Sequence, residues 1–162
     1  YGLIILATGP LGVFIAGSLI DKLHRAGQHN AELKVALLSI AICLPGVVYL
    51  PLAATGQAAL MAMIPASIGP AMTTASGSIA VINVTPNQIR GQTMALYLLT
   101  ISLLGLSLGP TAVALLTDYV FVDPAMIDWS ISCVVIVSSL FSAIMLWRCL
   151  DPFAEGVRNA VD

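Results

Sequence analysis

Charge is the first thing this sequence lacks. Only 9% of its 162 residues are Asp, Glu, Lys or Arg, whereas 59% are hydrophobic, and the mean hydropathy is +0.99. A soluble domain is about 25% charged. This scarcity excludes a soluble enzyme, a nucleic-acid-binding protein and a disordered tail. We therefore expect an integral membrane protein that has membrane lipid, and no nucleic acid, among its partners.

The few charges leave long uncharged runs, which occupy residues 1–20, 35–89, 91–117 and 129–147. About 20 apolar residues cross a hydrocarbon core of about 30 Å. The second run is too long for one span, and the polar residues 54–57 divide it. The pattern predicts an all-α integral membrane fold, in which residues 1–150 form a transmembrane bundle and 151–162 a cytoplasmic tail. The five predicted transmembrane helices cover about 2–20, 35–53, 58–84, 87–117 and 129–148.

Groups that carry out chemistry are also scarce. The three cysteines are odd in number and lie in apolar segments, so a disulfide framework is excluded. We interpret His24 and His29 as solvated loop residues. The sequence has no cluster with metal-ligand spacing, no nucleophile–base arrangement and no phosphate-binding loop. We expect no catalytic residue, no metal and no cofactor, and conclude that the chain is not an enzyme.

Basic residues are few, and all fall on one side of the predicted bundle. Five helices alternate in direction, so the connections after the first, third and fifth share a side. That side carries all six basic residues, which are Lys22, Arg25, Lys34, Arg90, Arg148 and Arg158. By the positive-inside rule this side is cytoplasmic. We expect a bacterial inner-membrane protein with a cytoplasmic C-terminus. Because the chain opens on Tyr1 inside an apolar run, we interpret it as a piece of a longer protein.

Glycine–proline pairs interrupt three of the predicted helices, at Pro10, Pro70 and Pro110. Proline removes a backbone hydrogen bond and clashes with the preceding turn, so each site predicts a kink. Single prolines are common in membrane helices. Several together favour helices that bend or line a cavity, as in transporters.

The fourth predicted helix carries two stripes at helical spacing. Gly105 and Gly109 belong to a small-residue stripe, which predicts close packing on another helix. Tyr97, Thr100 and Ser107 belong to a polar stripe on a different face. A polar stripe predicts either the wall of a substrate cavity or hydrogen bonds between helices. The third helix adds two candidates for the same cavity wall, Ser67 and Thr74.

Two charges oppose the dipoles of their predicted helices. Asp21 ends the first helix and Arg90 lies in the opening turns of the fourth, for which Thr85 is the predicted N-cap. A mutual ion pair would relieve both charges. In the alternative, Lys22 or Arg25 neutralises Asp21, and Arg90 faces lipid headgroups.

Two motifs around these charges resemble the major facilitator superfamily of transporters. Residues 17–27 (GSLIDKLHRAG) are similar to its loop signature G-x-L-x-D-R-x-G-R, in the copy between helices eight and nine. Residues 86–95 (PNQIRGQTMA) are similar to the P-x-x-x-R-G-x-x-x-A stretch that opens helix eleven. Within the superfamily, residues 104–118 look most like the spinster-like branch. The chain would then supply helices eight to twelve of a twelve-helix, two-bundle fold.

The resemblance implies alternating access, in which two bundles rock around a central site. It also implies that Asp21 acts as a cytoplasmic latch, with Arg90 as its partner and Lys22 and Arg25 in the same gate. The implied partners are a small organic or lipid-like solute and the missing N-terminal half of the protein. The alternative is a five-helix membrane scaffold or assembly subunit that does not transport.

Overall fold

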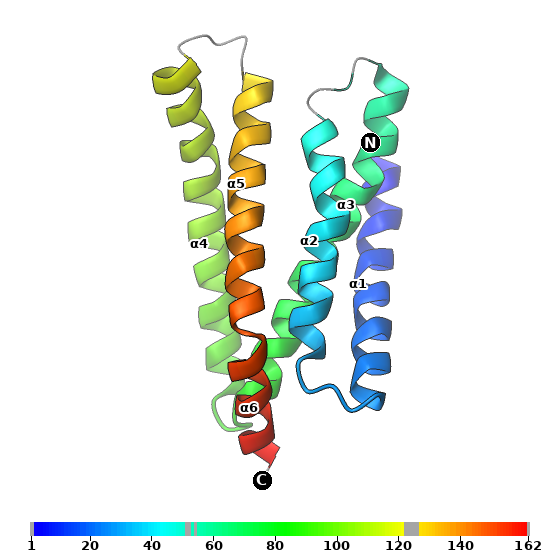
Figure 1. Ribbon diagram of the computed structural model, residues 1–162, viewed down its shortest axis with the longest axis vertical. Coiled ribbons are helices and arrows are strands. Elements are labelled where there is room, and N and C mark those ends of the chain that lie inside the picture. The colour runs from blue at the N-terminus through cyan, green and yellow to red at the C-terminus, as the bar shows by residue number, and fades with distance from the viewer. Residues whose placement is uncertain (1, 51–52, 54, 122–126, 162) are drawn as a thin grey trace.

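The computed structural model describes residues 2–50, 53, 55–121 and 127–161. Every regular element in this part of the chain is helical (Figure 1). The elements are α1 (Gly2–Arg25), α2 (Ala31–Tyr49), α3 (Gly56–Val84), α4 (Arg90–Leu116), the π-helix η1 (Thr117–Phe121), α5 (Ile127–Arg148) and α6 (Leu150–Val161). The helices α1 to α5 are long and apolar enough to span a membrane. The predicted all-α membrane fold is confirmed.

The helix ends differ from those predicted at the connections. Helix α1 continues to Arg25, so Asp21 lies inside the helix rather than at its end. Thr85 caps the C-terminus of α3 instead of starting α4, and its Oγ1 donates to Val81 O at 2.6 Å. The N-cap of α4 is Ile89, whose backbone N–H closes a turn on Pro86 O at 3.2 Å. The prediction of Thr85 as an N-cap was wrong because proline-containing capping sequences occur at both kinds of helix end.

The predicted tail also differs, because α6 is a helix of 12 residues. The chain order places α6 directly after α5, and Figure 1 shows it continuing beyond the lower end of the bundle. The connections after α1 and α3 lie at the same lower end, and the end of α2 and the start of α3 lie at the other. The predicted alternation of the spans is therefore confirmed, and the end that carries the basic residues is called the basic end below.

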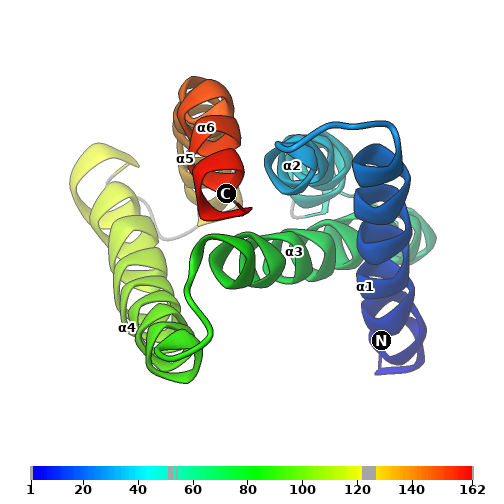
Figure 2. The same cartoon turned by 90° about the horizontal axis from the view of Figure 1, so that it is seen from below.

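Helix α3 organises the other spans. Figure 2 shows α3 running across the molecule, with α1 at one end of it and α4 at the other. Helices α2 and α5 lie on one side of α3; on the opposite side α1 and α4 extend past its two ends, and no described helix covers the middle of α3 between them. The most extensive contacts join α3 to α2 and to α1, and the next join α2 to α5. Helix α2 has the largest buried share of the five spans.

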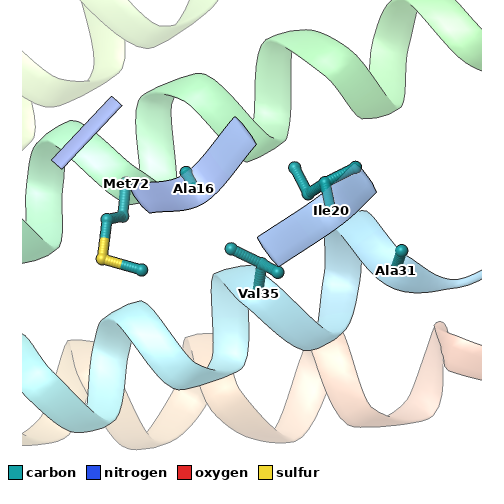
Figure 3. Packing of buried hydrophobic residues seen from close by; sticks show 5 residues of the cluster. All are labelled: Ala16, Ile20, Ala31, Val35 and Met72. Atoms are coloured by element: carbon teal, nitrogen blue, oxygen red, sulfur yellow. The ribbon is translucent and has the colours of Figure 1, made fainter. Parts of the chain in front are cut away.

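The apolar core lies where α1, α2 and α3 meet. Figure 3 shows its buried side chains pointing toward one another, and these are Ala16, Ile20, Ala31, Val35 and Met72. Glycines let the helix backbones approach around this core. A Cβ added to Gly12 would lie 2.8 Å from Ile68 O, and one added to Gly46 would lie 2.8 Å from Ala62 O. Small residues at the crossing points therefore set the spacing of these helices.

Hydroxyl groups add hydrogen bonds between the helices. The Oγ atoms of Ser39 and Thr73 lie 2.6 Å apart and join α2 to α3. At the C-terminal end of α4, Thr117 Oγ1 donates to Ser130 Oγ at 2.9 Å, which joins η1 to α5. Each hydroxyl thereby gains a partner that lipid cannot provide.

Candidate functional site

A buried carboxylate lies at the basic end of the molecule. Glu32, in the first turn of α2, has only 1% of its surface exposed. The N-terminal end of a helix favours a negative charge. A buried carboxylate nevertheless needs hydrogen-bond donors, because its transfer out of water is costly. Two donors reach it, and both come from other helices.

These donors make Glu32 the centre of a three-helix cluster. His24 Nε2 on α1 lies 3.0 Å from Glu32 Oε1, and Asn83 Nδ2 on α3 donates a short hydrogen bond to the same oxygen. The second oxygen, Glu32 Oε2, is buried and has no hydrogen-bond partner among the described residues. The cluster of His24, Glu32 and Asn83 thus ties three spans together at one end and leaves one acceptor open.

This cluster was not predicted from the sequence. Glu32 lies among polar loop residues, where a carboxylate is ordinarily solvated, and His24 was interpreted as solvated for the same reason. The structure corrects that interpretation, since the His24 imidazole is 37% exposed and paired with Glu32. The structure starts α2 at Ala31, four residues before the predicted start, and so places Glu32 in a first turn, where an acid stabilises the helix end.

The predicted pair of Asp21 and Arg90 is not formed in this structure. Asp21 is exposed on α1, and Arg90 begins α4 at the far end of α3. Neither residue takes part in an ion pair within the described ranges. Lys22 and Arg25 are exposed in the last turns of α1 and likewise unpaired there, so neither neutralises Asp21 by direct contact. Among the described acids near the α1–α2 connection, Glu32 forms an ion pair, and its partner is His24.

Arg90 lies beside a polar pocket. The pocket has a volume of about 280 Å³ and is formed by the end of α3, the following turn and the start of α4. Arg90 Nη2 makes one long contact of 3.5 Å to Thr85 O, and Arg90 Nε is buried without a hydrogen-bond partner among the described residues. The guanidinium therefore has a buried N–H donor, on Nε, that no described residue accepts from.

The candidate cavity residues fall into two groups. Ser67 lines a pocket of about 410 Å³ between α1, α2 and α3, and its Oγ also lies 2.7 Å from Thr8 Oγ1 on α1. Ser67 thus lines a pocket and also contacts a hydroxyl of another helix. Thr74 and Thr100 are exposed, and each donates only to the carbonyl four residues earlier in its own helix. Ser107 is exposed as well, and its backbone carbonyl accepts from Thr111.

Tyr97 reaches across from α4 to α3. Its hydroxyl lies against Gly77, where a Cβ would collide with the Tyr97 oxygen. The absence of a side chain at Gly77 therefore makes room for the tyrosine. Tyr97 is half-buried in this structure.

The glycine stripe of α4 does not contact another described helix. A Cβ added to Gly105 or Gly109 would meet no atom within 4 Å. The predicted close packing occurs instead at Gly12, Gly46 and Gly69. The prolines Pro10, Pro70 and Pro110 lie inside α1, α3 and α4, and the kinks expected at them stay a prediction.

The described residues contain no group of three or more His, Cys, Asp or Glu side chains that could hold a metal ion. Comparison with known proteins yields no match among protein-family models, curated proteins or solved structures. The geometry and the sequence motifs are thus the basis for assigning a function.

Proposed function

We propose that the chain is the C-terminal part of a secondary transporter of the major facilitator type. In this proposal it moves a small organic or lipid-like solute across a bacterial inner membrane by alternating access, with the basic end in the cytoplasm. The missing N-terminal half would supply the opposing bundle.

The observation that supports this proposal most directly is the one-sided arrangement around α3. Helices α2 and α5 cover one side of α3, whereas on the other side α1 and α4 flank its two ends and no described helix covers the middle of α3 between them (Figure 2). Exposed hydroxyls occur on the helices that border this open side, including Thr74 on α3 and Thr100 on α4. A half-transporter needs such a polar, uncovered side to face a substrate path. The two motifs around Asp21 and Arg90 support the same family.

The test is labelling of engineered cysteines in the full-length protein, reconstituted in lipid, after the native cysteines are replaced by serine. We expect a membrane-impermeant thiol reagent to modify T74C and T100C, because they face water in at least one state. The control is L106C, since Leu106 on α4 is 78% exposed and apolar and should face lipid. Saturating transported solute should slow the labelling of T74C and T100C. Labelling of neither position, or equal labelling of all three, would contradict a water-filled path.

One observation favours the alternative, a scaffold or assembly subunit. Helix α4 spans 27 residues and none of them is buried among the described residues. Such a helix suits an interface with another protein. In that case T74C, T100C and L106C would all resist the reagent, and the T100C thiol would crosslink to a partner subunit.

A further inference from the structure

The pocket beside Arg90 has the composition of an anion site. Its lining residues are Asn83, Val84, Thr85, Pro86, Asn87 and Arg90, and the last of these is the one charged residue among them. The pocket lies at the basic end, between the end of one membrane span and the start of the next. This is the depth at which lipid headgroups meet a membrane protein.

The Arg90 guanidinium has hydrogen-bonding capacity that the described residues do not use. Its Nε is buried without a hydrogen-bond partner among the described residues, and its Nη2 makes a single long contact of 3.5 Å to Thr85 O. A buried donor that stays unpaired is destabilising, because it has lost its hydrogen bonds to water. The planar fork of an arginine matches two oxygens of a phosphate or carboxylate. A ligand with two such oxygens would satisfy the buried Nε and a terminal nitrogen together.

No acid of the described residues neutralises Arg90. Glu32 is the acid that contacts a residue of this pocket. It accepts a hydrogen bond from the side chain of Asn83, which lines the pocket. Glu32 is already paired with His24 and forms no ion pair with Arg90. Arg90 also stands at the positive end of the α4 dipole, and the first turn of α4 contains no acid. An anion in the pocket would offset both the charge of Arg90 and the positive end of the α4 dipole.

We propose that this pocket binds a phosphate group, with the Arg90 guanidinium as its forked donor and the Asn87 amide at its rim. The phosphate can belong to an anionic lipid of the adjacent leaflet or to free inorganic phosphate, and both present the same oxygens. The site does not depend on transport, so it stands or falls separately from the proposed function.

The experiment measures lipid binding to the purified full-length protein in detergent by native mass spectrometry. The probes are dioleoylphosphatidylglycerol and dioleoylglycerol, which share their acyl chains and differ in the phosphoglycerol headgroup. We expect the phosphate-bearing lipid to bind at least tenfold more tightly. In R90Q this preference should be lost. R148Q is the matched control, since Arg148 is exposed at the basic end outside the pocket, and its preference should stay within twofold of the original.

Further arms identify the source of the phosphate and protect against a folding defect. If excess inorganic phosphate displaces the phosphatidylglycerol, the pocket also accepts free phosphate; if it does not, the site is a lipid site. R90K keeps the charge and removes the fork, so it should fold even where R90Q does not, and we expect binding several-fold weaker than in the original. Unchanged binding in R90Q or R90K, or equal binding of the two lipids, would overturn the proposal.

Discussion

The three helices α1, α2 and α3 and the single helix α4 have similar composition but opposite packing. In the first region, glycine contacts, buried alanines and hydroxyl pairs hold the helices together. In α4, the glycines face open space and no residue is buried. A small-residue stripe therefore permits close packing without providing it. The contact exists only where a second helix presents a complementary surface.

The largest expected effect comes from filling a glycine in each region. Gly69 lies against Cys43 and Ser39 of α2, and a Cβ there would come within 3.0 Å of Ser39 O. We expect G69V to destabilise the protein by about 3 kcal/mol through overpacking. G109V is the matched control on α4. Thermal unfolding in detergent should separate the two, and an equal melting temperature would show that the glycine contacts do not stabilise the first region.

The second effect concerns the buried acid. We expect E32Q to cost about 2 kcal/mol, because it removes the charged acceptor for His24 and Asn83. D21N is the control, since Asp21 is exposed and unpaired in the described structure. Chemical unfolding should leave D21N within about 0.5 kcal/mol of the original protein. The reverse order, with D21N the more harmful, would mean that Asp21 is the structural acid.

A smaller effect is expected for a hydroxyl that joins two helices. S39A should cost about 1 kcal/mol, because Thr73 Oγ1 loses its partner on α2. Thr73 keeps a bond to Gly69 O, which limits the loss. Parallel melts of S39A, T73V and the double variant should show that the two losses are not additive. Full additivity would indicate that the two hydroxyls act independently.

The smallest effect belongs to α4. T100V removes a hydroxyl that bonds only to Leu96 O of the same helix, so stability should change by less than about 0.5 kcal/mol. Solute transport is the sharper measurement here. A large loss of transport with an unchanged melting temperature would place Thr100 in the substrate path, whereas a change in neither would favour a lipid-facing position.

The spans and their alternation could be predicted from the sequence because both depend on local features. An uncharged run of sufficient length must be helical in a bilayer, and the loops between such runs retain their charges. The six basic residues supplied an internal check on the number of spans. These inferences required no knowledge of which helices touch.

Contacts between helices could not be predicted in the same way. Glu32 is buried because α1 and α3 cross beside the first turn of α2, and nothing in its neighbouring residues records that crossing. Gly69 was seen only as part of a glycine–proline pair, although its main role in the structure is to let Cys43 approach. Pairing rules based on helix dipoles selected Asp21, which has the right charge but lies on an exposed part of α1.

The length of α3 links the shape of the molecule to the thickness of its bilayer. With 29 residues, α3 is about 44 Å long at 1.5 Å per residue, whereas the hydrocarbon core is about 30 Å thick. A helix longer than the core can tilt to fit it, and the tilt needed decreases as the bilayer thickens. Since α1 and α4 lie at opposite ends of α3 (Figure 2), a more upright α3 draws these two helices together. We therefore expect the distance between α1 and α4 to change with the chain length of the surrounding lipids.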